Sequence, residues 1–110
     1  MIDWERVSEL RDEVGADDFA EVVDLFLEEV GGTIGTLRDA PDMSTLEADL
    51  HFLKGAALNL GFEAFSSLCQ KGEHLAGAGR AEEVDLPAIL DCFETSRGTF
   101  TEELPNRLAA

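Results

Sequence analysis

Basic residues are scarce in this 110-residue chain, which has eight lysines and arginines against twenty-four aspartates and glutamates. The formal net charge of −16 argues against nucleic acid or an anionic membrane as a partner, because both attract basic surfaces. Long apolar runs are also absent, since no uninterrupted stretch approaches the roughly 20 residues of a membrane span. The first residues, Met-Ile-Asp-Trp-Glu, have no secretion-signal pattern, so we expect a soluble, cytoplasmic protein.

Cysteine is limited to Cys69 and Cys92, which lie far apart and form no Cys-x-x-Cys pair. Two buried free thiols in a reducing compartment are therefore expected. Two separated cysteines and two histidines make no zinc pattern. A di-metal carboxylate bundle would need Glu-x-x-His on two helices, but neither His51 nor His74 has a glutamate three residues before it. We expect no metal and no other cofactor on this chain.

The acidic charge is uneven along the sequence. Residues 1–50 carry three basic and fifteen acidic side chains, residues 82–110 carry two and seven, and residues 51–81 carry three and two. The only stretch that is not acidic contains both histidines, and an anion or an acidic partner site could be met there. Chance variation between segments explains the same numbers equally well.

Apolar residues recur at three- and four-residue steps along most of the chain, which is typical of amphipathic helices. No segment alternates with a period of two, so strands are not expected. The chain is therefore predicted to be one all-α domain over residues 1–110, an antiparallel up-down four-helix bundle with a short additional N-terminal helix. The expected helices cover about residues 3–14, 18–37, 44–61, 63–76 and 85–105.

Local signals mark several expected helix ends. Asp3 can cap the first helix, and residues 18–21 and 44–47 have the spacing of capping boxes. Asp85 followed by Leu-Pro places a proline in the first turn of the last helix. Pro105 is expected to end that helix, because proline cannot donate a backbone hydrogen bond.

The eleven residues 51–61, His-Phe-Leu-Lys-Gly-Ala-Ala-Leu-Asn-Leu-Gly, are the most informative stretch. At about 100° per residue, Leu50, Leu53 and Leu60 fall on one side of a helix and His51 falls on the opposite side. The leucines must face the core, so we expect His51 at the centre of the polar face. Its neighbours on that face are Glu47, Lys54, Gly55 and Leu58.

This arrangement suits an imidazole that accepts a phosphoryl group. An unperturbed imidazole is largely neutral at cellular pH, so one ring nitrogen is a free nucleophile. Lys54, one turn from His51, can offset the charge of a phosphoryl group, and Gly55 leaves room for the modified ring and a partner. Phe52 and Leu58 are candidate apolar contacts for that partner, although Phe52 could instead be half-buried against a neighbouring helix. A merely solvated histidine and lysine remain the alternative.

His51-Phe-Leu-Lys-Gly, followed by small residues and the helix-ending Gly61, resembles the signature of histidine-containing phosphotransfer (HPt) domains. The resemblance implies a phosphorelay carrier whose His51 takes a phosphoryl group from a receiver-domain aspartate, such as that of a hybrid histidine kinase. The carrier would pass the group to another response regulator, with Lys54 assisting. Magnesium would be bound by the receiver and not by this chain.

The segment Leu68-Cys-x-x-x-Glu73 resembles the next helix of the same family. The resemblance implies that Glu73 steadies one ring nitrogen of His51 and leaves the other free to attack. One departure is Gly72, where the family usually has a leucine-like residue, and this glycine is expected to loosen the helix beside Glu73. His74 matches no functional position and is expected to lie at the surface.

Other functions remain open at this stage. No glycine-rich nucleotide loop followed by Lys-Ser/Thr is present, so the chain is expected to be a phosphocarrier without kinase activity of its own. The principal alternative is a helical adaptor that binds a receiver or a kinase without carrying phosphate, and a metal-binding bundle is a third possibility. We expect a monomer, although an apolar helix stripe alone does not distinguish a bundle core from a dimer seam.

Overall fold

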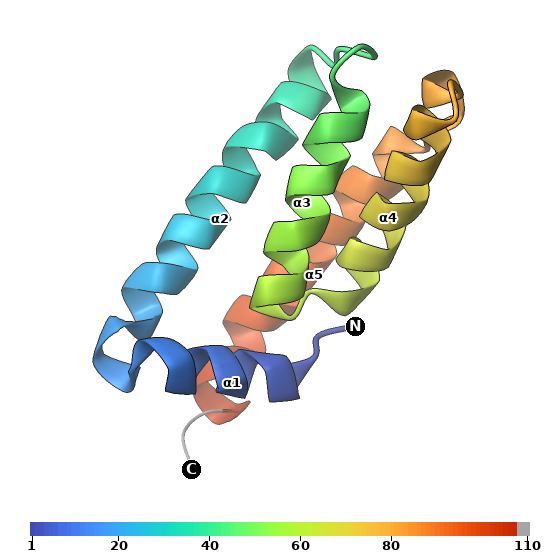
Figure 1. Cartoon of the computed structure of the whole chain (residues 1–110). Coiled ribbons are helices and arrows are strands. Elements are labelled where there is room, and N and C mark those ends of the chain that lie inside the picture. The colour runs from blue at the N-terminus through green and yellow to red at the C-terminus, as the bar shows by residue number, and fades with distance from the viewer. Residues whose placement is uncertain (108–110) are drawn as a thin grey trace.

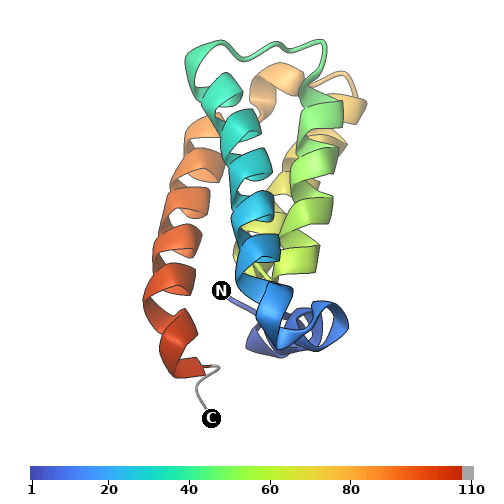
Figure 2. The same cartoon turned by 90° about the vertical axis from the view of Figure 1, so that its left-hand side faces the viewer.

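The computed structural model describes residues 1–107, which form five α-helices and one short 3₁₀-helix. Four long helices lie side by side, each antiparallel to the next, and the shorter α1 crosses one end of them (Figures 1 and 2). The predicted all-α bundle with an extra N-terminal helix is therefore confirmed. The elements are α1 (Trp4–Val14), α2 (Ala16–Asp39), α3 (Leu46–Leu60), α4 (Glu63–Gly77), η1 (Ala81–Glu83) and α5 (Leu86–Arg107).

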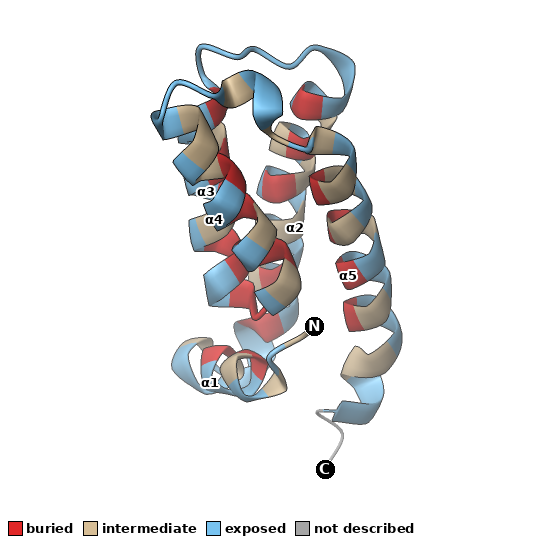
Figure 3. Cartoon of the chain, turned by 90° about the vertical axis from the view of Figure 1, so that its right-hand side faces the viewer, coloured by how far each residue is buried: buried red, intermediate tan, exposed pale blue. Residues whose placement is uncertain are grey.

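The core forms where the apolar stripes of the long helices meet, and Figure 3 shows buried positions on their inward faces. Leu46, Leu50, Leu53 and Leu60 of α3 are at most 2% exposed, as the sequence periodicity predicts. Each buried leucine contributes about 1.5–3 kcal/mol through removal of its apolar surface from water. This burial fixes the rotation of α3 about its axis, so the opposite face of the helix is turned to solvent. Within residues 1–107, no helix is both long enough and apolar enough to cross a membrane.

The N-terminal segment closes one end of the bundle. The Asp3 side chain accepts a hydrogen bond from the backbone N–H of Arg6, which confirms the predicted cap of α1. The backbone N–H of Asp3 donates to the carbonyl of Gly61 over 2.7 Å, which ties the chain start to the turn between α3 and α4. Trp4 stacks on Phe100 of α5 with ring centroids 5.7 Å apart. Helix α1 therefore holds the ends of α3 and α5 together.

Gly61 ends α3 in the left-handed conformation, with φ of +83°, which glycine adopts without strain. A Cβ at this position would lie 2.7 Å from the carbonyl oxygen of Asp3. We predict that Gly61→Ala lowers the free energy of unfolding by about 3 kcal/mol, because backbone strain and a clash with main chain add together. Gly79 has φ of +78° with nothing within 4 Å of a Cβ, so Gly79→Ala should cost about 1 kcal/mol. Urea denaturation measures both; equal losses would contradict the proposed clash.

The two predicted capping boxes are wrong. Helix α2 begins at Ala16, before Asp18, and its N-cap Gly15 makes no side-chain hydrogen bond. The hydroxyl of Ser44 donates to Asp42 over 2.6 Å and does not cap α3, whose N-cap is Thr45 without a side-chain capping bond. The local turn at residues 42–44 thus competes successfully for the polar groups that a capping box would use.

The last helix begins as predicted and ends later. Asp85 accepts a hydrogen bond from the backbone N–H of Ala88, so it caps the start of α5. Pro105 lies inside α5, and the prediction that it ends the helix is wrong. A contact with α1 stabilises the final turn of α5, because the Arg107 guanidinium lies 5.4 Å from the centroid of the Trp4 ring. Two smaller differences are that Cys92 is only half-buried and that residues 81–83 form η1.

Candidate functional site

His51 lies in the second turn of α3, on the face opposite the buried leucines. Its side chain is 68% exposed, so the predicted position in solvent is confirmed. Because α3 is rotated by its leucine stripe, the imidazole stands on a surface that another protein can reach.

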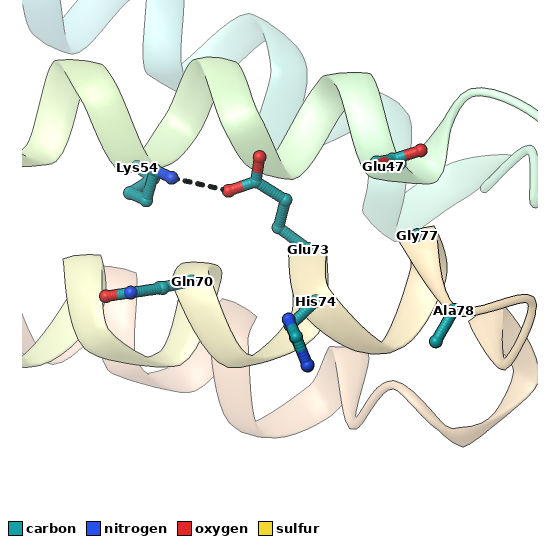
Figure 4. Close-up of a pocket in the computed structure, with 7 residues that line it drawn as sticks. All are labelled: Glu47, Lys54, Gln70, Glu73, His74, Gly77 and Ala78. Carbon is teal, nitrogen blue, oxygen red and sulfur yellow. Dashed lines mark ion pairs between the residues drawn. The ribbon is translucent and has the colours of Figure 1, made fainter.

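Glu73 of α4 connects His51 and Lys54 of α3. Its Oε2 lies 2.6 Å from His51 Nδ1, and its Oε1 lies 2.7 Å from Lys54 Nζ. Figure 4 shows Glu73 reaching from α4 toward Lys54. The three residues that the sequence singles out for the chemistry are thus brought together, and one carboxylate touches both partners.

The charge of Glu73 follows from these contacts. The hydrogen bond from the Lys54 ammonium lowers the pKa of Glu73 most strongly, the bond to His51 lowers it further, and partial desolvation opposes both. An ionised carboxylate has only acceptor sites, so His51 Nδ1 must donate the proton in their bond. In a neutral ring this leaves the lone pair on Nε2, the nitrogen that does not face Glu73.

Gly72 does not loosen α4, contrary to the prediction from the sequence. The helix runs without interruption from Glu63 to Gly77, and Gly72 is buried. A Cβ at this position would lie 2.8 Å from Cδ1 of Leu50 and 3.3 Å from Cδ1 of Ile89. The missing side chain therefore lets α4 lie close to α3 at the residue before His51, which brings Glu73 within reach of the ring.

The remaining candidate residues lie on the surface around His51. A Cβ at Gly55 would meet nothing within 4 Å, so the packing of this chain gives no reason for a glycine there. Leu58 is 57% exposed and Phe52 is 40% exposed, so Phe52 is partly covered, as one of the two predictions has it, and still offers apolar surface to solvent. These two apolar groups lie on either side of Gly55 in the sequence, and a partner that covers His51 could contact them.

Glu47 lies farther along α3 and faces a different part of α4. Its Oε2 would come within 2.6 Å of a Cβ at Gly77, so the carboxylate packs against the end of α4 (Figure 4). Among residues 1–107, no hydrogen bond or ion pair joins Glu47 to His51 or Lys54. It is therefore not part of the cluster made by the other three residues.

A hollow of about 470 Å³ lies between α3 and α4 next to this cluster. Sequence reasoning did not anticipate that Gln70 and His74 would border it together with Lys54 and Glu73. His74 itself is exposed, as predicted. The residues that line the hollow are Glu47, Lys54, Gln70, Glu73, His74, Gly77 and Ala78 (Figure 4).

The fold and the site together define a class of protein: a helical bundle that holds an exposed imidazole against a carboxylate on its surface. Comparison with protein-family models matches residues 21–110 to the Hpt domain. The chain therefore belongs to the Hpt domain family, whose members have a histidine phosphotransfer role in two-component signalling and interact with receiver domains in phosphorelays. Neither the curated proteins nor the solved structures gave a match.

Proposed function

We propose that this chain is a phosphorelay carrier whose His51 accepts a phosphoryl group from the aspartate of one receiver domain and delivers it to another. The observation that supports this most directly is the exposed imidazole whose Nδ1 is bound to the ionised Glu73, 2.6 Å away. That bond orients the ring and leaves Nε2 as the nucleophile. Lys54 supplies a positive charge beside the same carboxylate.

In the proposed reaction, the lone pair of His51 Nε2 attacks the phosphorus of the receiver's aspartyl phosphate. The new bond joins nitrogen to phosphorus, and the bond between phosphorus and the aspartate oxygen breaks, so aspartate leaves as a carboxylate. The Nδ1 proton stays on the ring, which thereby gains positive charge that the Glu73 carboxylate offsets. Transfer to the next receiver reverses these steps.

Lys54 has a separate role in this proposal. Its ammonium lies one turn from His51 and 2.7 Å from Glu73, so a small rotation of its stem brings it beside a phosphoryl group on Nε2. Magnesium bound by the receiver would offset charge from the other side. The contribution of this chain is position and charge, which is how most phosphoryl-transfer proteins act.

The partner would dock on the exposed surface around the ring. Phe52 and Leu58 offer apolar area there, and Gly55 leaves the approach to the imidazole open. We expect the carrier to act as a monomer, because the leucine stripe of α3 is buried within the chain and needs no second copy to cover it.

The test uses a purified receiver domain charged with a small-molecule acyl phosphate. We expect it to label this protein rapidly with a phosphate that acid removes and alkali does not, as is characteristic of phosphohistidine. The adaptor alternative predicts that the receiver binds without transferring label. Screening the receivers encoded near this gene would identify the fastest donor and acceptor.

A further inference from the structure

Lys71 differs from the other basic residues of the protein. Each of the other seven lysines and arginines takes part in an ion pair, a hydrogen bond or another contact. Within residues 1–107, the ammonium of Lys71 has no such partner, although acidic residues outnumber basic ones three to one. An exposed cation without a partner is unexpected in a protein of net charge −16.

The outer side of α4 beside Lys71 carries a hollow without carboxylates, which we call the α4 basic surface, while Glu83 and Asp85 line a separate hollow that Lys71 also borders. The hollow of the α4 basic surface has a volume of about 460 Å³, and His74, one turn after Lys71, projects from α4 away from α3 (Figure 4). The residues that line this hollow are Ser67, Gln70, Lys71, His74 and Leu75. Four of the five offer polar groups that can donate hydrogen bonds, and none is a carboxylate.

The α4 basic surface is continuous with the site at His51. Its hollow shares Gln70 and His74 with the hollow between α3 and α4, which Lys54 and Glu73 also line. Glu73 in turn touches the imidazole. A protein seated over His51 and extending across α4 would therefore cover Lys71 as well.

Charge identifies the kind of partner that fits. The sequence before His51 carries fifteen of the acidic residues and three of the basic ones, so an acidic partner is repelled over α1 and α2. On α4 the same partner meets Lys71 without a competing carboxylate in the hollow. Opposite charges placed in this way steer a complex and select its orientation more than they tighten it.

We propose that Lys71 and His74 bind an acidic segment of the receiver domain that exchanges phosphoryl groups with His51. This inference rests on the proposed function, because it assigns the receiver's orientation on the same site. The α4 basic surface would then select among receivers by charge, while the cluster at His51 carries out the transfer.

The test is the charge reversal Lys71→Glu, with transfer from the charged receiver measured as a function of receiver concentration. We expect the KM for the receiver to rise about three- to tenfold at low salt, which is the scale of losing one exposed attraction and adding one repulsion. The rate at saturating receiver should stay unchanged, because His51, Lys54 and Glu73 are untouched. The KM difference should shrink in high salt through screening, and Lys71→Arg should retain the wild-type KM.

Arg97→Glu controls for the change in net charge, because it changes that charge by the same amount on α5, which lies behind α3 and α4 in Figure 1. Its KM should equal that of the wild type. Equal KM values for Lys71→Glu and the wild type, or equal increases in both variants, would overturn the inference while the proposed function stands. A receiver that binds but never labels the wild-type protein would overturn both.

Discussion

Replacement of His51 by glutamine is expected to abolish phosphoryl transfer while changing the free energy of unfolding by less than about 0.5 kcal/mol. Glutamine has no nucleophilic ring nitrogen, so the acceptor is lost outright. Stability should be retained because the imidazole is 68% exposed and lies on the face of α3 opposite the buried leucines. Labelling by a charged receiver measures the first effect, and urea denaturation measures the second.

The same variant distinguishes a phosphoryl carrier from an adaptor that only binds the receiver. A receiver should still bind His51→Gln, because the exposed Phe52 and Leu58 are unchanged. Undiminished labelling of the variant would show that another residue accepts the phosphate. A loss of several kcal/mol in unfolding free energy would show that His51 is structural, in conflict with its exposure.

Replacement of Glu73 by alanine should slow transfer at saturating receiver by about 10- to 100-fold, the scale seen when a residue that orients a metal-binding histidine is removed. Two effects combine, since the ring loses the acceptor for Nδ1–H and the ion pair that holds Lys54 is broken. Single-turnover rates with one charged receiver measure the loss.

Glu73→Gln is the informative companion, because an amide oxygen still accepts from Nδ1 while the negative charge is gone. We expect its rate to lie between those of the wild type and Glu73→Ala. A rate equal to the wild type would mean that only ring orientation matters. A rate equal to the alanine variant would mean that the charge of Glu73 supplies the whole effect.

The stability of the wild type relative to Glu73→Gln should depend on pH in one direction. Folding lowers the pKa of Glu73 below its ordinary value of 4.5, chiefly through Lys54. The carboxylate therefore contributes stability above pH 4.5, and this contribution is lost as the pH falls through the lowered value. Urea denaturation of both proteins from neutral to acid pH tests the sign, and a difference that grows on acidification would contradict it.

The sequence predicts the rotation of α3 well, because that rotation depends on a simple periodicity. Burial of the leucines leaves only one side for His51, and no tertiary detail is needed. The link to Glu73 is different, since the sequence offers only a family resemblance for it. Whether the carboxylate reaches the ring depends on how closely α4 approaches Leu50, and that distance is set by Gly72 in three dimensions.

The mistaken helix ends have a related explanation. Each helix end was predicted from its own short segment of sequence. In the structure, the position of a helix end also depends on contacts with residues distant in sequence and on competing local hydrogen bonds. Ser44 bonds to Asp42 in a turn instead of capping α3, and Trp4 of α1 supports the turn of α5 that contains Pro105. Local preferences of about 1 kcal/mol are easily reversed by such contacts.

Trp4 is the only tryptophan of the protein, and its ring contacts Phe100 and Arg107 of α5 at the end of the bundle that α1 closes. His51 lies nine residues before the α1-side end of α3, or about 13 Å along the helix axis. The intrinsic fluorescence of the protein therefore reports on the detachment of α1. The same indole signal should stay constant when the distant imidazole is modified, which gives a built-in measure of folding that is independent of the signalling state.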